Sequence, residues 1–148
     1  MLDIFIKAEQ YDQRLALRDQ DRSYTYKDLV KASTNIASAL LSEKLDLKEE
    51  RIGFLISPSF NYVSILWGIW KAGGIGVPLS LSATESELIH YLEDAKVSLL
   101  ISDNKGCKRL KKLSDDLNIP LEDEKNLQGD EDKALPKIKK ERKAMILF

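Results

Sequence analysis

The chain alternates between two kinds of apolar pattern over its first 121 residues. Helical patterns, with apolar residues every three or four positions, follow Thr25 and Thr84, and a third stretch, apolar on nearly every side, spans about 59–72. Between them lie short, nearly unbroken apolar runs typical of strands buried on both faces, at 52–56, 75–79 and 97–101. Helices that separate such strands act as crossover connections, so the pattern predicts an α/β fold with a mostly parallel sheet flanked by helices.

The helices that follow Thr25 and Thr84 begin with the pattern of a capping box. Each threonine can accept a hydrogen bond from a backbone amide of the first turn, and Asp28 or Glu87, three positions later, can reach back to the threonine amide. A short strand is expected at 15–17, before the first helix. The inward face expected for the helix after Thr25 consists of Leu29, Ala32, Ile36 and Leu40. For the helix after Thr84 it consists of Leu88, Tyr91 or Leu92, and Ala95. For a last helix before Ile119 it consists of Leu110, Leu113 and Leu117.

Gly73 and Gly74 follow the apolar helix and precede a strand. Phosphate-binding loops place their glycines the other way round, after a strand and before a helix, because the helix amides then face the anion. We therefore interpret the pair as a helix stop, in which glycine adopts a left-handed backbone that other residues reach only with steric strain.

The segment 60–81 is long enough to cross a bilayer, and Lys71 is its only charged residue. A lysine at mid-span costs about 2.5 to 3.5 kcal/mol in a membrane, and Pro78 and the glycine pair interrupt a helix there. The segment is therefore expected to be a buried helix, a turn and a buried strand, with no transmembrane span.

Composition excludes several classes of protein. The 148 residues are 43% apolar and 32% charged, with 23 basic and 24 acidic side chains, which is typical of one globular domain and lacks the basic field that nucleic-acid binding needs. Cys107 is the only cysteine, so no internal disulfide can form, and the N-terminus lacks the pattern of a secretory signal. We expect a reducing, cytoplasmic location and no nucleic-acid partner.

The density of charged residues differs between the first 121 residues and the segment that follows them. Residues 122–142 combine many charges with few apolar anchors, so a poorly ordered connector is expected there, after an α/β subdomain at 1–121. Apolar residues return at 143–148, where Ala144 to Phe148 have the pattern of a buried strand with no turn or polar residue after it. We therefore expect the sequence to be an excerpt of a longer chain, cut where a strand leads into its next loop.

Few residues suggest chemistry by themselves. Glu87 and His90 have the spacing of a di-iron helix, but the second copy is missing, and no other histidine exists for a metal or a catalytic triad. Neighbouring lysines could lower the pKa of the Cys107 thiol, but without a histidine partner a plain thiol is favoured. The basic residues at 105–112 are interpreted as the solvated face of a helix. These residues predict no catalytic, cofactor-binding or metal-ligating group.

Three blocks carry a resemblance to a known family. The first has the pattern Thr-Tyr-x-Glu-Leu, with aspartate in place of glutamate, and is formed by Thr25, Tyr26, Asp28 and Leu29. The second is Lys-Ala-Gly followed by an apolar strand ending in proline, and is formed by Lys71, Ala72, Gly73, Gly74, Pro78 and Leu79. A helix at 87–95 is the third. In order and spacing, 10–103 and 143–148 resemble the N-terminal subdomain of adenylate-forming synthetases, which include acyl-CoA synthetases, luciferases and peptide-synthetase adenylation domains.

The resemblance implies an enzyme that activates a carboxylic acid in two steps. The acid attacks ATP to give an acyl-adenylate and pyrophosphate, and the acyl group then passes to coenzyme A. It also implies that 144–148 lead into a phosphate-binding loop and that the groups for ATP, magnesium and the acid lie beyond Phe148. The motif residues then serve as scaffold, the 148 residues alone hold no cofactor and are inactive, and their main partner is the remainder of their own chain.

The substrate class and the acceptor have alternatives. Residues 68–80 are most similar to malonate-type and related acid–CoA ligases. A peptide-synthetase adenylation domain, with a carrier protein as acceptor, is an alternative within the superfamily. Outside it, a free-standing, non-enzymatic α/β module would bind a partner through the helix at 105–112 or the edge of its last strand. Homo-oligomerisation is left open.

Overall fold

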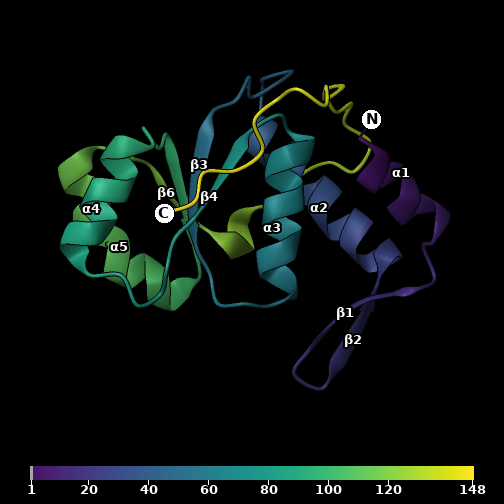
Figure 1. The fold of residues 1–148 in the computed structure, drawn as a ribbon, viewed down its shortest axis with the longest axis horizontal. Coiled ribbons are helices and arrows are strands. Elements are labelled where there is room, and N and C mark those ends of the chain that lie inside the picture. The colour runs from purple at the N-terminus through teal and green to yellow at the C-terminus, as the bar shows by residue number, and fades with distance from the viewer. Residues whose placement is uncertain (1) are drawn as a thin grey trace.

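The computed structural model describes residues 2–148 and has three layers (Figure 1). Its elements are α1 (Asp3–Gln10), β1 (Leu15–Asp19), β2 (Arg22–Thr25), α2 (Tyr26–Leu41), β3 (Arg51–Leu55), α3 (Phe60–Lys71), β4 (Ile75–Pro78), α4 (Glu85–Asp94), β5 (Leu99–Ser102), α5 (Asn104–Leu117), β6 (Leu121–Asp123) and the 3-10 helix η1 (Glu124–Asn126). A parallel sheet in the order β4-β3-β5-β6 lies between α2 and α3 on one face and α4 and α5 on the other. The predicted α/β fold with a mostly parallel sheet is confirmed.

The central strand β3 contributes to a core on each face of the sheet. Ile52 and Phe54 are fully buried with residues of α2 and α3, whereas Leu55 packs with residues of α4 and α5. Because helices cover both faces, every position of such a strand except its first is shielded from water. This explains why the inner part of β3 carries no charged side chain.

The capping boxes of α2 and α4 form as predicted. Thr25 pairs with Asp28 and Thr84 with Glu87, each through both hydrogen bonds of the box. Leu88, Leu92 and Ala95 are buried, so Leu92 rather than Tyr91 lies on the inward face of α4. In α5, Leu110 and Leu113 are buried and Leu117 is half-buried.

The inward face predicted for α2 is fully buried only at Leu29, while Ile36 and Leu40 pack against the core at its margin. Ala32, Ile36 and Leu40 are only half-buried, and the buried residues of the helix are Leu29, Ser33, Ala37, Ser38 and Leu41. The prediction favoured large apolar side chains, whereas four of the five buried positions after the start of α2 carry small side chains or lie at its end, at Ser33, Ala37, Ser38 and Leu41. Helices α2 and α3 are so close that a Cβ on Gly68 of α3 would lie 2.5 Å from Cγ2 of Ile36.

No helix within residues 2–148 combines the length and the apolar character that a bilayer requires. The apolar helix expected from the sequence is α3, which has 12 residues and ends at Lys71. The expected turn and strand follow it, since β4 starts at Ile75.

The expected connector crosses the surface next to α2. The strand β6 spans the boundary expected between residues 121 and 122, and Leu127 is buried in the core formed with α2 and α3. Farther along, Glu131 pairs with Lys31, and Lys133 donates a hydrogen bond to the carbonyl oxygen of Ser42. The poor order expected for residues 122–142 stays a prediction.

The last residues lie beside β4 (Figure 1). The amide of Gly76 donates to the oxygen of Ala144 at 2.9 Å, and the amide of Ile146 donates to the oxygen of Gly76 at 3.0 Å. The pairing amounts to one parallel bridge, between Gly76 and Met145, and Met145 and Ile146 are half-buried against the two cores. The buried strand expected here stays a prediction.

Gly73 is the left-handed residue that ends α3. Its φ is +87°, whereas Gly74 has an ordinary backbone and is approached closely by side chains of Ile69 and Leu47. A Cβ on Gly73 would collide with Oδ1 of Asp46 and lie 2.8 Å from Nη1 of Arg142. The predicted helix stop is therefore confirmed at the first glycine of the pair.

Gly73→Val should destabilise the chain. The valine would combine a left-handed backbone with a collision at Asp46, and we expect a loss of about 1 kcal/mol or more. The thermal unfolding midpoint measures the loss. The control Lys96→Gly changes an exposed residue whose φ is already +53°, and should leave the midpoint equal or higher. An unchanged midpoint in Gly73→Val would contradict the assignment.

Candidate functional site

The first motif fixes the start of α2. Oγ1 of Thr25 accepts a hydrogen bond from the amide of Asp28 at 3.2 Å, and Oδ2 of Asp28 accepts one from the amide of Thr25 at 2.8 Å. The negative side chain also suits the positive end of the helix dipole. Tyr26 follows the cap and packs on the small core that contains Leu29. The motif thus determines where the inner face of α2 begins.

The first motif contacts α3 through Leu29. Its side chain is buried together with Trp67 of α3 and with Phe5 and Ala8 of α1. The rings of Phe5 and Trp67 meet edge to face, with centroids 5.3 Å apart, a favourable geometry for aromatic pairs. Three segments that are distant in sequence are joined by this cluster.

Lys71 connects the second motif to α2. Its Nζ donates hydrogen bonds to the oxygen of Val30 at 3.3 Å and to Oγ1 of Thr34 at 3.1 Å, and it lies 5.3 Å from the centre of the Phe5 ring. Burial lowers the pKa of Lys71 to about 8, against a smaller opposing effect of Glu9. The sequence predicted a structural residue here, and the structure places it across the α2–α3 contact.

The rest of the second motif forms the turn into β4. The oxygens of Ala72 and Gly73 accept hydrogen bonds from the amides of Leu47 and Glu49, at 2.9 and 2.8 Å. At the far end of β4, beyond Pro78, the amide of Leu79 donates to the oxygen of Phe54 at 2.9 Å. These residues therefore hold backbone segments together and leave few backbone groups for a ligand.

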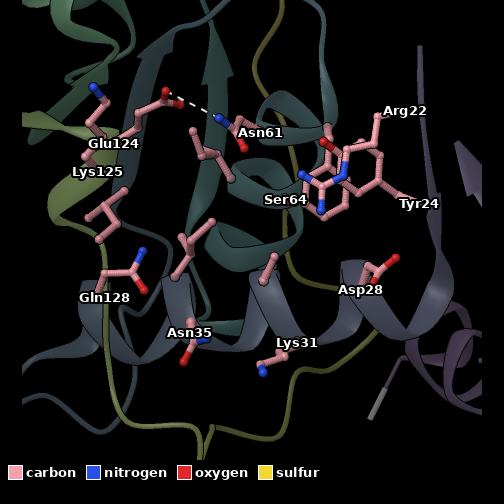
Figure 2. Close-up of a pocket in the computed structure, with 15 residues that line it drawn as sticks. Arg22, Tyr24, Asp28, Lys31, Asn35, Asn61, Ser64, Glu124, Lys125 and Gln128 are labelled. Atoms are coloured by element: carbon pink, nitrogen blue, oxygen red, sulfur yellow. Dashed lines mark hydrogen bonds between the residues drawn. The ribbon is translucent and has the colours of Figure 1, made fainter. Parts of the chain in front are cut away.

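A cavity of about 440 Å³ lies between α2, the first turns of α3 and η1 (Figure 2). Figure 2 shows Arg22 and Tyr24 of β2 at one end of this cavity and Glu124 at the other. The Tyr24 ring stacks on Phe60 with centroids 3.9 Å apart, and the guanidinium of Arg22 lies 5.0 Å from the Tyr24 centroid. One end of the cavity is thus lined by stacked side chains of the protein.

Two buried polar atoms of this cavity have no hydrogen-bond partner among residues 2–148. They are Oγ of Ser64 and Oε2 of Glu124. Asn61 donates to Oε1 of Glu124 at 3.3 Å, and burial raises the pKa of the Glu124 carboxyl. An unpaired buried polar group costs about 1 to 3 kcal/mol, so these two atoms make the wall of the cavity locally less stable.

Sequence reasoning missed this cavity. Its polar residues come from β2, α2, α3 and η1, so no local spacing brings them together. One signal was present, because Asn61 and Ser64 are polar residues three positions apart in the first turns of a largely apolar helix.

The other sequence candidates have structural roles. Glu87 is held by Thr84 in the cap of α4, and His90 lies beside Tyr91. Burial and nearby acidic residues raise the pKa of the Cys107 thiol, which disfavours the reactive thiolate. Arg109 donates hydrogen bonds to backbone oxygens of the loop before α4. Within residues 2–148, no three His, Cys, Asp or Glu side chains are grouped as metal ligands.

Comparison with known proteins identifies the family. Residues 4–148 match the family described as AMP-binding enzyme, and the chain therefore belongs to the AMP-binding enzymes. The mitochondrial malonate–CoA ligase of Mus musculus is 33% identical over 122 residues, which are 80% of this chain and 21% of the relative. The chain thus spans about a fifth of the length of this curated relative.

Solved structures share the fold. Apo MatB from Rhodopseudomonas palustris has a TM-score of 0.81 at 18% identity, over 98% of this chain and 32% of that protein. The N-terminal subdomain of NpsA from Klebsiella oxytoca, in complex with 3-hydroxybenzoyl-AMSN, has a TM-score of 0.78 at 21% identity, over 98% of this chain and 36% of that one. The resemblance to the N-terminal subdomain of adenylate-forming synthetases is confirmed.

The wild-type chain should become more stable at alkaline pH, and Lys71→Met should remove this gain. Because the pKa of Lys71 is about 8 in the folded chain and ordinarily 10.5, the unfolded chain binds the proton more tightly between these values. The wild type therefore gains stability as pH rises through this window, by up to about 3 kcal/mol relative to Lys71→Met. Urea unfolding at several pH values measures the difference. The exposed control Lys96→Met should show the same dependence of stability on pH as the wild type. If Lys71→Met also showed the wild-type dependence, the lowered pKa of Lys71 would be refuted.

Glu124→Gln should stabilise the chain at neutral pH. The raised pKa means that the folded chain prefers the protonated carboxyl. The charged carboxylate therefore destabilises the folded chain once the pH rises above the ordinary pKa of glutamate. Glutamine removes the charge and keeps an acceptor for Asn61. We expect a higher thermal midpoint at about pH 7 and a smaller gain near pH 4. The exposed control Glu122→Gln should show neither effect, and a gain that grows in acid would count against this reading.

Proposed function

We propose that this chain is the N-terminal scaffold of an ATP-dependent acid–CoA ligase that activates malonate or a closely related acid. In the proposed reaction, a carboxylate oxygen attacks the α-phosphorus of ATP and pyrophosphate leaves. The sulfur of coenzyme A then attacks the acyl carbonyl and releases AMP. The observation that carries the proposal is the 33% identity to a malonate–CoA ligase over 80% of the chain.

The residues described here do not fit ATP or magnesium. The amides of Gly73 and Gly74 donate to the oxygens of Trp70 and Ile69, and the amide of Gly76 donates to Ala144, so none of them is free for a phosphate. Residues 2–148 hold no group of three metal-ligating side chains. We therefore assign the nucleotide, the metal and the acid to other parts of the complete protein, and no step of the reaction to this chain's own residues.

The role assigned to this chain is to hold its own layers in place. Leu29 and Lys71 of the two motifs connect α2 to α3, and Gly73 directs the chain from α3 into β4. A catalytic face built elsewhere requires a rigid support, because small displacements of reacting groups cost large factors in rate. The cytoplasmic location is part of the proposal, supported by the single, unpaired Cys107.

The substrate class can be tested on the product of the complete reading frame that contains these residues. Exchange of labelled pyrophosphate into ATP should depend on an added acid, and we expect malonate to support it better than acetate or hexanoate. Exchange with none of these acids would overturn the proposed class. Transfer from the adenylate to coenzyme A supports a ligase, whereas transfer only to a carrier protein would replace it with the peptide-synthetase alternative.

The 148-residue chain alone should not bind ATP. Its glycine amides are already hydrogen-bonded, and it lacks a grouped set of metal ligands. Isothermal titration with ATP and magnesium should show no saturable heat. The full-length protein is the positive control. Micromolar affinity of the short chain for ATP would contradict the scaffold role.

A further inference from the structure

Lys71 is a buried cation without a matching anion. The residue is only 7% exposed, and no carboxylate of residues 2–148 comes within 4 Å of its Nζ. The hydrogen bonds to Val30 and Thr34 go to neutral oxygens and use two of the three ammonium donors. A buried charge is strongly destabilising unless it is paired, so this site favours an anion.

A separate cavity of about 300 Å³ adjoins this ammonium. Lys71 and Thr34 are at its polar end, and its walls are largely apolar side chains of α1 and of the segment at 135–138. Phe5 is fully covered, and Pro136 and Ile138 are half-buried. The volume is at the lower end of the range of small-molecule sites.

We propose that this cavity binds a short-chain monocarboxylate. The carboxylate accepts a hydrogen bond from Nζ of Lys71, and the alkyl tail lies against Phe5, Pro136 and Ile138. This site is distinct from the one that would activate an acid in the complete protein, and it does not rest on the proposed function.

Charge and polarity select this class of ligand. Lys71 is the one buried cation of the cavity, and Glu9 at its rim repels a second negative charge, which disfavours dicarboxylates. A phosphate needs several donors, whereas one ammonium donor remains and the adjoining walls are apolar. Burial of each further methylene of a tail strengthens binding about fourfold, so affinity should rise from butyrate to hexanoate.

A competing occupant is the chain's own Glu9. This exposed side chain of α1 does not contact Lys71 in the structure, but it is near enough to raise the lysine's pKa. If Glu9 competes with the ligand, Glu9→Gln should bind a monocarboxylate more tightly than the wild type does. Weaker binding in this variant would contradict an anion bound beside Glu9.

The experiment is an amide NMR titration of the 148-residue chain with sodium butyrate and sodium hexanoate. We expect saturable shifts at Phe5, Thr34 and Lys71, with hexanoate the tighter ligand. Butanamide, which has the same tail without the charge, should cause no saturable shift. Lys71→Met should weaken binding at least about tenfold, whereas the rim control Lys137→Met should change it less than threefold.

Several results would overturn the proposal. They are the absence of saturable shifts in the wild type, equal binding of butanamide and butyrate, weaker binding in Glu9→Gln, and unchanged affinity in Lys71→Met. If Lys71→Met fails to fold, Ile138→Glu serves in its place, because it puts a negative charge on the half-buried wall. That variant should abolish butyrate binding, and wild-type affinity in it would equally refute the site.

Discussion

The close contact between α2 and α3 is the constraint on which the N-terminal part of the chain depends. Gly68 has no side chain, and a Cβ there would be 3.1 Å from the oxygen of Ser33 as well as against Ile36. With the helices at this distance, Lys71 reaches the backbone of α2 and Trp67 reaches Leu29. Leu29 of the first motif and Lys71 of the second therefore lie on opposite sides of one helix–helix contact.

Local features of the fold could be predicted because their causes are local. A threonine followed by an acidic residue three positions later fixes the start of a helix with its own hydrogen bonds, as at Thr25 and Thr84. Gly73 ends a helix through its own backbone geometry. The parallel sheet follows from the order of such elements, since helical crossovers leave few alternative topologies.

Features set by contacts between distant segments could not be predicted. The inward face of α2 depends on which residues of α3 it meets, and polar Ser33 and small Ala37 do not stand out in the sequence as core positions. Likewise, the unpaired carboxylate oxygen of Glu124 and hydroxyl of Ser64 become significant only when η1 and α3 lie together. Lys71 was recognised as part of a motif, but its lack of an anionic partner emerged only from the three-dimensional contacts.

The bridge between Gly76 and Met145 has a consequence for folding order. Strands β3, β4 and β5 pair with neighbours supplied by successive βα units, whereas this bridge joins residues separated by almost half of the chain. Closing so long a loop carries an entropic cost that only a completed sheet can offset. The tail should therefore dock late, and during synthesis the outer edge of β4 remains open to unwanted strand pairing until Ala144 and Ile146 arrive.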